Sequence, residues 1–232
     1  MREYNAMKST REIFYKLKHL SRKWENYFDV YDKILPQYVG KKPNMLEIGV
    51  AKGGSTEMWI KYFDNEINMF CVDIDKACLD YKYDGVTVDA ACLDQSDPEQ
   101  WDAYLKNKPK FDIIIDDGGH EMMQQIVTLN KLFPYLADGG TMIIEDTHTS
   151  YWEQWGGGFK RETSFIEYVK NLIDLQHAPF INAAPPPEVI AIFAGLKSVT
   201  FYNSMVILEK GPTRPAVEAD SAKLKNPNFE WN

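Results

Sequence analysis

The chain has 232 residues, of which 44% are hydrophobic and 26% charged, and its formal net charge is −8. This composition is typical of a soluble globular protein, and the length suits one substantial domain with an appendage. The acidic balance argues against nonspecific nucleic-acid binding, and no apolar run approaches the roughly 20 residues of a membrane span. Three cysteines are too few for a disulfide framework, and residues 1–20 lack the apolar core of a signal peptide, so we expect a cytoplasmic protein.

The N-terminal segment is basic and periodic. Residues 1–42 carry a net +5, whereas residues 43–232 carry −13. A solvated basic helix explains this asymmetry, and so would a set of acidic cation ligands after residue 42. Apolar side chains recur at spacings of three and four over residues 9–37, which predicts one or two helices.

From residue 44 onward, short apolar runs alternate with helical stretches. We expect strands at Met45–Ile48, Met69–Asp73, Val86–Asp89, Phe111–Asp116, Thr141–Glu145, Val199–Tyr202 and Met205–Glu209. We expect helices at Ser55–Phe63, Pro98–Asn107, Glu121–Leu136 and Ser164–Leu175, with a turn at Lys76–Tyr81.

This order predicts the fold class. Alternating strands and helices indicate a doubly wound, Rossmann-like α/β sheet of seven strands. The last two strands are separated by only two residues, so they should form a C-terminal antiparallel hairpin. We divide the chain into an N-terminal helical extension (1–42), a main α/β domain (43–210) and a C-terminal tail (211–232).

The first strand–helix turn is rich in glycine and suits ligand binding. Gly49, Gly53 and Ser55 allow a close backbone approach at a helix start. A nicotinamide-binding turn needs a middle glycine where Ala51 stands, which disfavours an oxidoreductase. Glu47 would repel a pyrophosphate but suits a cationic ligand, so the turn resembles the nucleotide loop of class I S-adenosylmethionine-dependent methyltransferases. The alternative is a turn that only connects strand and helix.

Acidic and amide side chains at the next strand ends complete a nucleoside site. Asp73 lies at the spacing expected of a residue that accepts hydrogen bonds from ribose hydroxyls. Asp94 and Gln95 would lie over the adenine, although this stretch also suits a helix cap by Ser96 or Asp97. We assign Asp116, at the end of a buried strand, to the cofactor-binding set as well.

Carboxylates at two strand ends predict a metal site. Asp117, Glu145 and Asp146 follow strands whose carboxyl ends should be adjacent. Neither segment contains Lys or Arg, and a divalent cation would relieve the repulsion. Oxygen ligands favour Mg²⁺, with Mn²⁺ as the alternative, over Zn²⁺. The competing interpretation is that some of these carboxylates cap loops or pair with distant basic residues.

Two histidines stand close to these carboxylates. His120 lies three residues after Asp117 and is our candidate for the general base, which makes these two the catalytic pair. His148 is the competing base, and its other role would be to orient a metal-bound carboxylate.

Three stretches carry a family resemblance. Residues 115–120 (IDDGGH), 145–152 (EDTHTSYW) and 198–204 (SVTFYNS) resemble the macrolide-sugar O-methyltransferases, which include the macrocin and mycinamicin enzymes. This resemblance implies a class I methyltransferase domain over 43–210 and Mg²⁺-dependent methyl transfer from S-adenosylmethionine to a sugar hydroxyl. It also implies that Asp117, Glu145 and Asp146 bind the metal and that His120 is the base.

The acceptor is the least constrained part of this prediction. His148, Tyr151 and Trp152 are candidates for contacting a small-molecule hydroxyl acceptor, expected to be a sugar, although aromatic residues are also ordinary packing residues. A catechol-type enzyme acting on a phenolic diol would use the same chemistry. A noncatalytic S-adenosylmethionine-binding module is the third alternative. The N-terminal helices and Val189–Phe193 could form a homo-oligomer interface or cover the active site of a monomer.

Overall fold

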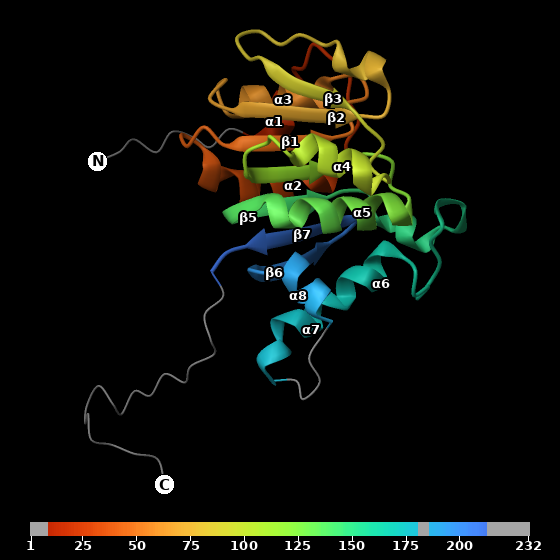
Figure 1. Cartoon of the computed structure of the whole chain (residues 1–232). Coiled ribbons are helices and arrows are strands. Elements are labelled where there is room, and N and C mark those ends of the chain that lie inside the picture. Colours follow the sequence, from red (N-terminus) through yellow and green to blue (C-terminus); the bar gives the residue numbers. More distant parts are fainter. Residues whose placement is uncertain (1–8, 181–185, 213–232) are drawn as a thin grey trace, which may run out of the picture.

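The computed structural model describes residues 9–180 and 186–212, which form a three-layer α/β fold (Figure 1). Seven strands form one sheet in the order β3-β2-β1-β4-β5-β7-β6. Their bounds are β1 Asn44–Ile48, β2 Asn68–Asp73, β3 Val88–Cys92, β4 Phe111–Asp116, β5 Leu136–Ile144, β6 Leu196–Tyr202 and β7 Met205–Lys210. The first five strands are parallel, and β7 and β6 add an antiparallel hairpin to β5. The predicted fold class is confirmed.

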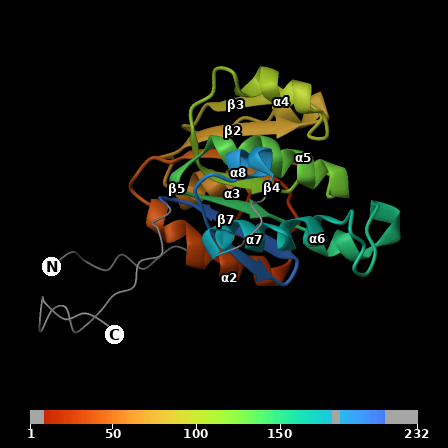
Figure 2. The same cartoon turned by 60° about the horizontal axis from the view of Figure 1, so that its bottom comes forward.

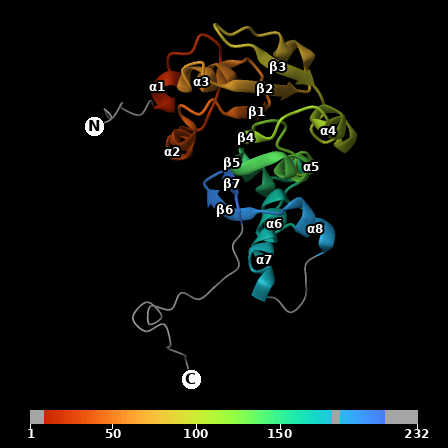
Figure 3. The same cartoon turned by 60° about the vertical axis from the view of Figure 1, so that its left-hand side comes forward.

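Helices cover both faces of the sheet. Their bounds are α1 Thr10–Phe14, α2 Glu25–Ile34, α3 Gly54–Tyr62, α4 Pro98–Leu105, α5 Met122–Leu132, α6 Phe165–Lys170, α7 Leu172–Gln176 and α8 Pro187–Ile192. Figure 3 shows α1, α2 and α3 on one side of the strands and α4, α5 and α6 on the other. Among the described residues, no helix is long and apolar enough to cross a membrane.

The central strands are apolar because both of their faces are buried. In β4, Ile114 packs with Trp101 and Leu129 on the face of α4 and α5. Ile113 and Ile115 point the other way, into a second cluster that holds Tyr27, Phe28 and Tyr31 of α2 together with Trp59 of α3. Alternation along a strand sends successive side chains to opposite faces. The N-terminal helices therefore share a hydrophobic core with the sheet.

The elements differ from the sequence-based expectation in several places. The helix expected at Glu121–Leu136 ends at Leu132 and is followed by a 3₁₀ turn, Phe133–Tyr135; β6 begins at Leu196, before the expected Val199; and α8 is an additional helix. Residues 15–24 are not helical, and they connect α1 to α2. The third strand lies two residues later than expected, and β5 begins at Leu136 because its first part pairs with Phe111. The helix expected at Ser164–Leu175 is divided at Asn171 into α6 and α7.

The carboxyl ends of the parallel strands carry the functional loops. Residues 147–164 follow β5 and project beyond the sheet, where they are drawn in green to teal in Figure 2. They contain two short 3₁₀ turns, Thr147–Tyr151 and Glu153–Trp155. The predicted C-terminal tail from residue 213 onward lies outside the described residues.

Candidate active site

Two cavities lie at the carboxyl ends of the strands, on either side of Asp117. The first measures about 180 Å³ and opens where β1 lies between β2 and β4. This is the topological switch point of the sheet, where β2 lies on one side of β1 and β4 on the other, and open α/β sheets bind ligands at such points. The second measures about 280 Å³, and its lining comes from the N-terminal segment and from the ends of β4 and β5: Arg22, Lys23, Trp24, Tyr27, Asp117, Glu145 and Asp146.

Four of the predicted cofactor residues line the first cavity: Gly49, Asp73, Asp94 and Gln95. Gly49 has φ +87°, and a Cβ there would lie 2.1 Å from the carbonyl oxygen of Asp117, so only glycine fits. The Asp73 carboxylate accepts hydrogen bonds from the amides of Val50 and Ala51, at 2.8 and 3.1 Å. Asp73 therefore fixes the glycine-rich turn as well as facing the cavity.

The other four predicted cofactor residues lie outside that lining. Glu47 is fully buried and accepts hydrogen bonds from Trp59 Nε1 (2.9 Å) and from Thr56 Oγ1, and burial raises its pKa. Gly53 backs onto two tyrosine rings, and Ser55 is buried in the first turn of α3. These three residues support the turn from behind in this structure.

Asp116 is the fourth of these residues. It is buried at the end of β4 and accepts a hydrogen bond of 3.0 Å from Gln95 Nε2. Burial raises the pKa of Asp116 to about 7. Gln95 also accepts a hydrogen bond from the Gly119 amide at 2.7 Å. This network ties the floor of the first cavity to the loop that carries His120.

A lysine lies between two of the predicted metal ligands. Lys23 Nζ is 2.6 Å from Asp117 Oδ2 and 2.7 Å from Glu145 Oε2, and its side chain is only 1% exposed. Burial alone would lower the Lys23 pKa, but the two carboxylates hold it above its ordinary value. The competing interpretation, that some of these carboxylates pair with a distant basic residue, is therefore confirmed for Asp117 and Glu145, although the sequence did not identify Lys23 as that residue. It lies 94 positions from Asp117 along the chain and 122 from Glu145.

Helix α2 and the residue before it supply three more contacts to these carboxylates. The Tyr31 hydroxyl donates to Glu145 Oε1 at 2.6 Å, and burial raises the Glu145 pKa. Asp146 Oδ1 accepts from the Tyr27 hydroxyl at 2.6 Å and from Trp24 Nε1 at 3.1 Å. The N-terminal helical segment is therefore part of the site.

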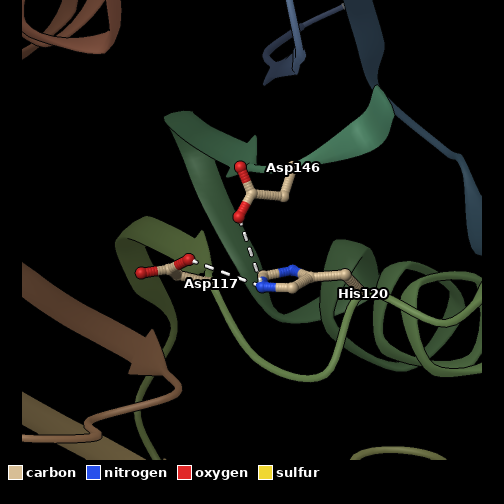
Figure 4. A group of neighbouring side chains, drawn as sticks. All are labelled: Asp117, His120 and Asp146. Atoms are coloured by element: carbon tan, nitrogen blue, oxygen red, sulfur yellow. Dashed lines mark ion pairs between the residues drawn. The ribbon is translucent and has the colours of Figure 1, made fainter. Parts of the chain in front are cut away.

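Among the described residues, Asp117, His120 and Asp146 form a group whose potential ligand atoms all lie within 4.8 Å of one another. Figure 4 shows both carboxylates directed at the His120 ring, with Nε2 3.4 Å from Asp146 and 3.9 Å from Asp117. Glu145, predicted with them, instead faces Lys23 and Tyr31.

Burial affects both the charge and the hydrogen bonding of His120. Its pKa is lowered by desolvation of the imidazolium, although the carboxylates of Asp117 and Asp146 oppose this effect. Its Nδ1 has no hydrogen-bond partner among the described residues. The lowered pKa favours the neutral ring, and the unprotonated nitrogen of a neutral imidazole can act as a proton acceptor or a metal ligand.

His148 and Trp152, two of the three predicted acceptor residues, lie beside this cluster. His148 Nδ1 contacts the Ser204 hydroxyl, and its ring packs edge-on against Trp24 and Trp152, at centroid distances of 5.7 and 4.5 Å. Trp152 is 44% exposed and Tyr151 50%, so both present aromatic surface to solvent. His148 lies farther from the carboxylates than His120 does, with Nδ1 3.9 Å from Asp146.

The donor set fits a hard divalent cation. Carboxylate oxygens are the preferred ligands of Mg²⁺, and an imidazole nitrogen suits Mn²⁺. A lysine ammonium already marks a cation position between Asp117 and Glu145. The first cavity likewise suits a nucleoside, because its lining includes the carboxylates of Asp73 and Asp94 and the amide of Gln95, which can form hydrogen bonds with ribose hydroxyls and with a base.

Comparisons with known proteins agree with the predicted resemblance. The chain is 32% identical over 206 residues to 8-demethyl-8-alpha-L-rhamnosyl tetracenomycin-C 2'-O-methyltransferase of Streptomyces olivaceus, a match that covers 84% of this chain and 53% of that enzyme. It is 29% identical to demethylmacrocin O-methyltransferase of Streptomyces fradiae, over 84% of this chain and 51% of the relative. No protein-family model matches the chain.

Among solved structures, the chain resembles the MycE methyltransferase of the mycinamycin biosynthetic pathway in complex with Mg and SAH. The TM-score is 0.74 at 25% identity, covering 91% of this chain and 57% of the other. This chain spans about half the length of the curated relatives it matches. The predicted resemblance is confirmed, and the chain is related to the macrocin- and mycinamicin-type sugar O-methyltransferases.

Proposed function

We propose that this relative of the sugar O-methyltransferases transfers the methyl group of S-adenosylmethionine to a hydroxyl of a sugar or glycosylated natural product, with Mg²⁺ bound. The observation that carries the proposal is the cluster of Asp117, His120 and Asp146, in which Asp117 lines both cavities and Asp146 lines the second. A site that only bound a nucleoside would need neither a metal-binding set nor a buried base.

S-adenosylmethionine would bind in the first cavity. Asp73 would accept hydrogen bonds from the ribose, and Asp94 and Gln95 would lie along the adenine. Glu47 and Asp116 lie behind this lining and would hold the cavity in shape. The methyl-bearing end of the cofactor would then point toward Asp117, the residue that lines both cavities.

The metal would bind at Asp117 and Asp146, with Glu145 as the third ligand that the family resemblance implies. Bound Mg²⁺ supplies positive charge that lowers the pKa of an acceptor hydroxyl. Tyr27 and Trp24 hold Asp146 through two hydrogen bonds and would keep its free oxygen directed into the site.

His120 would remove the acceptor proton. Its Nε2 faces the cluster, and burial lowers its pKa, which favours the neutral ring that a general base requires. As the O–H proton moves to Nε2, the oxygen forms a bond to the methyl carbon and the carbon–sulfur bond breaks. The products are the methyl ether and S-adenosylhomocysteine. The main contribution of the protein would be to align the oxygen, carbon and sulfur atoms.

The acceptor would enter through the second cavity, whose lining residue Trp24 packs against His148, and His148 packs in turn against Trp152. Tyr151, next to Trp152 in the chain and half exposed, would be a further contact. Exposed aromatic faces suit a sugar ring, and they would also accept the phenolic diol of a catechol-type substrate. A screen of glycosides and catechols with S-adenosylmethionine and Mg²⁺, read by mass spectrometry, tests the proposal. Methylation of a glycoside supports it. Methylation of catechols alone would assign the other acceptor class, and no transfer to either class would contradict it.

A further inference from the structure

The Lys23 ammonium occupies a position between two carboxylates that a metal ion would share. The lysine contributes one positive charge to Asp117 and Glu145, and Asp146 lies in the same cavity. Its side chain is 1% exposed, and such buried lysines occur only when paired. The two N–O distances are short, so this ammonium is a specific occupant of the carboxylate pair.

The backbone of the segment that carries Lys23 is fixed. This segment, residues 15–24, is called the strap below. Glu57 of α3 accepts hydrogen bonds from the Lys18 and His19 amides, at 3.0 and 2.8 Å. The Gly54 amide donates to the Leu20 carbonyl, which would lie 2.6 Å from any Cβ on Gly54. These contacts hold the strap against the first turn of α3 and place Lys23 over the carboxylates.

We infer that Lys23 is a built-in competitor for the divalent cation, so that metal binding displaces its ammonium from Asp117 and Glu145. This inference rests on the metal site of the proposed function. A divalent cation that took Asp117 and Glu145 as ligands would lie close to the ammonium that contacts Asp117 Oδ2 and Glu145 Oε2, and the two positive charges would repel each other. The adjoining cavity of about 280 Å³, which Lys23 already lines beside the exposed Arg22, gives the displaced side chain room.

The metal can bind only when Lys23 has left the carboxylates. The apparent Kd for the metal is therefore the Kd of the free site divided by the fraction of protein in which Lys23 is displaced. A site vacated about one tenth of the time binds its ligand about tenfold more weakly than a free site. Lys23→Met keeps an unbranched side chain and removes the ammonium. We therefore expect its Kd for Mn²⁺, measured by calorimetry, to fall at least about tenfold, with one ion bound as in the unmodified chain.

Two controls separate competition from a general charge effect. Arg22→Met removes a positive charge from the same cavity without breaking a contact to Asp117 or Glu145, so its Kd should change much less. Glu57→Gln weakens the anchor of the strap at a distance from the site, and it should tighten Mn²⁺ binding in the same direction as Lys23→Met. This variant keeps the test available if Lys23→Met does not fold.

Displacement itself can be read by acetylating lysines in the unmodified chain and quantifying each by mass spectrometry. Lys23 should be protected without metal and acetylated severalfold faster with saturating Mn²⁺, whereas the exposed Lys16 should react equally in both states. Mn²⁺ binding with Lys23 still protected would overturn the inference and leave the proposed function intact. Absence of Mn²⁺ binding in both the unmodified chain and Lys23→Met would overturn the inference and the proposed metal site together.

Discussion

Glu57→Gln should destabilise the fold by releasing the strap from α3. The Glu57 side chain is buried, and its carboxylate accepts hydrogen bonds from the Lys18 and His19 amides, from His19 Nδ1 and from Lys61. Burial would raise the Glu57 pKa, but these donors, Lys61 foremost, lower it to about 2. Relative to an ordinary value near 4.5, this shift corresponds to about 3 kcal/mol at neutral pH.

The amide of glutamine keeps one acceptor oxygen but carries no charge, so we expect a loss of about 2 kcal/mol at pH 7. The sign of the pH dependence follows from the lowered pKa. The stabilisation is fully present above about pH 4.5 and disappears as pH falls toward 2. Urea unfolding at several pH values between 7 and 3 should therefore show that the unfolding free energies of the unmodified chain and of Glu57→Gln become more similar as the pH falls.

Glu66→Gln is the matched control for this prediction. Glu66 is exposed beyond the turn that follows α3, so its substitution should change the unfolding free energy by less than about 0.5 kcal/mol. A Glu57→Gln loss no larger than that of the control, or a loss that does not vary with pH, would refute the assigned role of Glu57.

Three further predictions concern the site. His120→Ala should reduce kcat by about 10²–10⁴. The acidic limb of the kcat/KM profile of the unmodified protein should lie below pH 6.5, because burial lowers the His120 pKa. A loss of kcat under about tenfold would assign the base to His148 instead. Gly49→Ala should lower the unfolding free energy by about 2 kcal/mol, because its Cβ would meet the Asp117 carbonyl. The same substitution should weaken S-adenosylmethionine binding in calorimetry, and an unchanged affinity would contradict the role of Gly49 in the cofactor cavity. Asp117→Asn should abolish metal-stimulated turnover, because it removes the charge of a proposed ligand. Retained stimulation would exclude Asp117 as a ligand.

The parallel sheet could be predicted from sequence because its signal is local. Continuous apolar runs such as Ile113–Ile115 and the glycine-rich turn at Gly49 each lie within one element or at its end. The third strand is expected two residues too early because Ala90 and Ala91, which belong to β3, have weak β propensity. Its position is set by pairing with β2 instead, with Met69 opposite Val88.

The strap shows why the rest could not be predicted. Residues 15–24 continue the helical periodicity of the N-terminal segment, but the amides of Lys18 and His19 bond to Glu57 instead of to the preceding turn. Tertiary hydrogen bonds here override local propensity. The pairing of Lys23 with Asp117 spans 94 positions and leaves no periodic pattern. The one feature of the sequence that pointed to such a pairing is charge, because residues 1–42 carry a net +5 and residues 43–232 carry −13.

The predicted site residues differ in how well local spacing located them. Asp117, His120 and Asp146 come together because two neighbouring parallel strands end at the same edge. Glu145 points to the other face, toward Tyr31, as expected for successive residues at a strand end. Its role as a metal ligand stays a prediction.

The most direct test of the account is methyl transfer to a glycoside acceptor before and after metal removal. Product formation should stop when the protein is treated with excess EDTA and should return when Mg²⁺ is added back. S-adenosylmethionine should remain bound throughout, as measured by calorimetry. Undiminished methyl transfer in excess EDTA would contradict the assignment of these carboxylates to a metal.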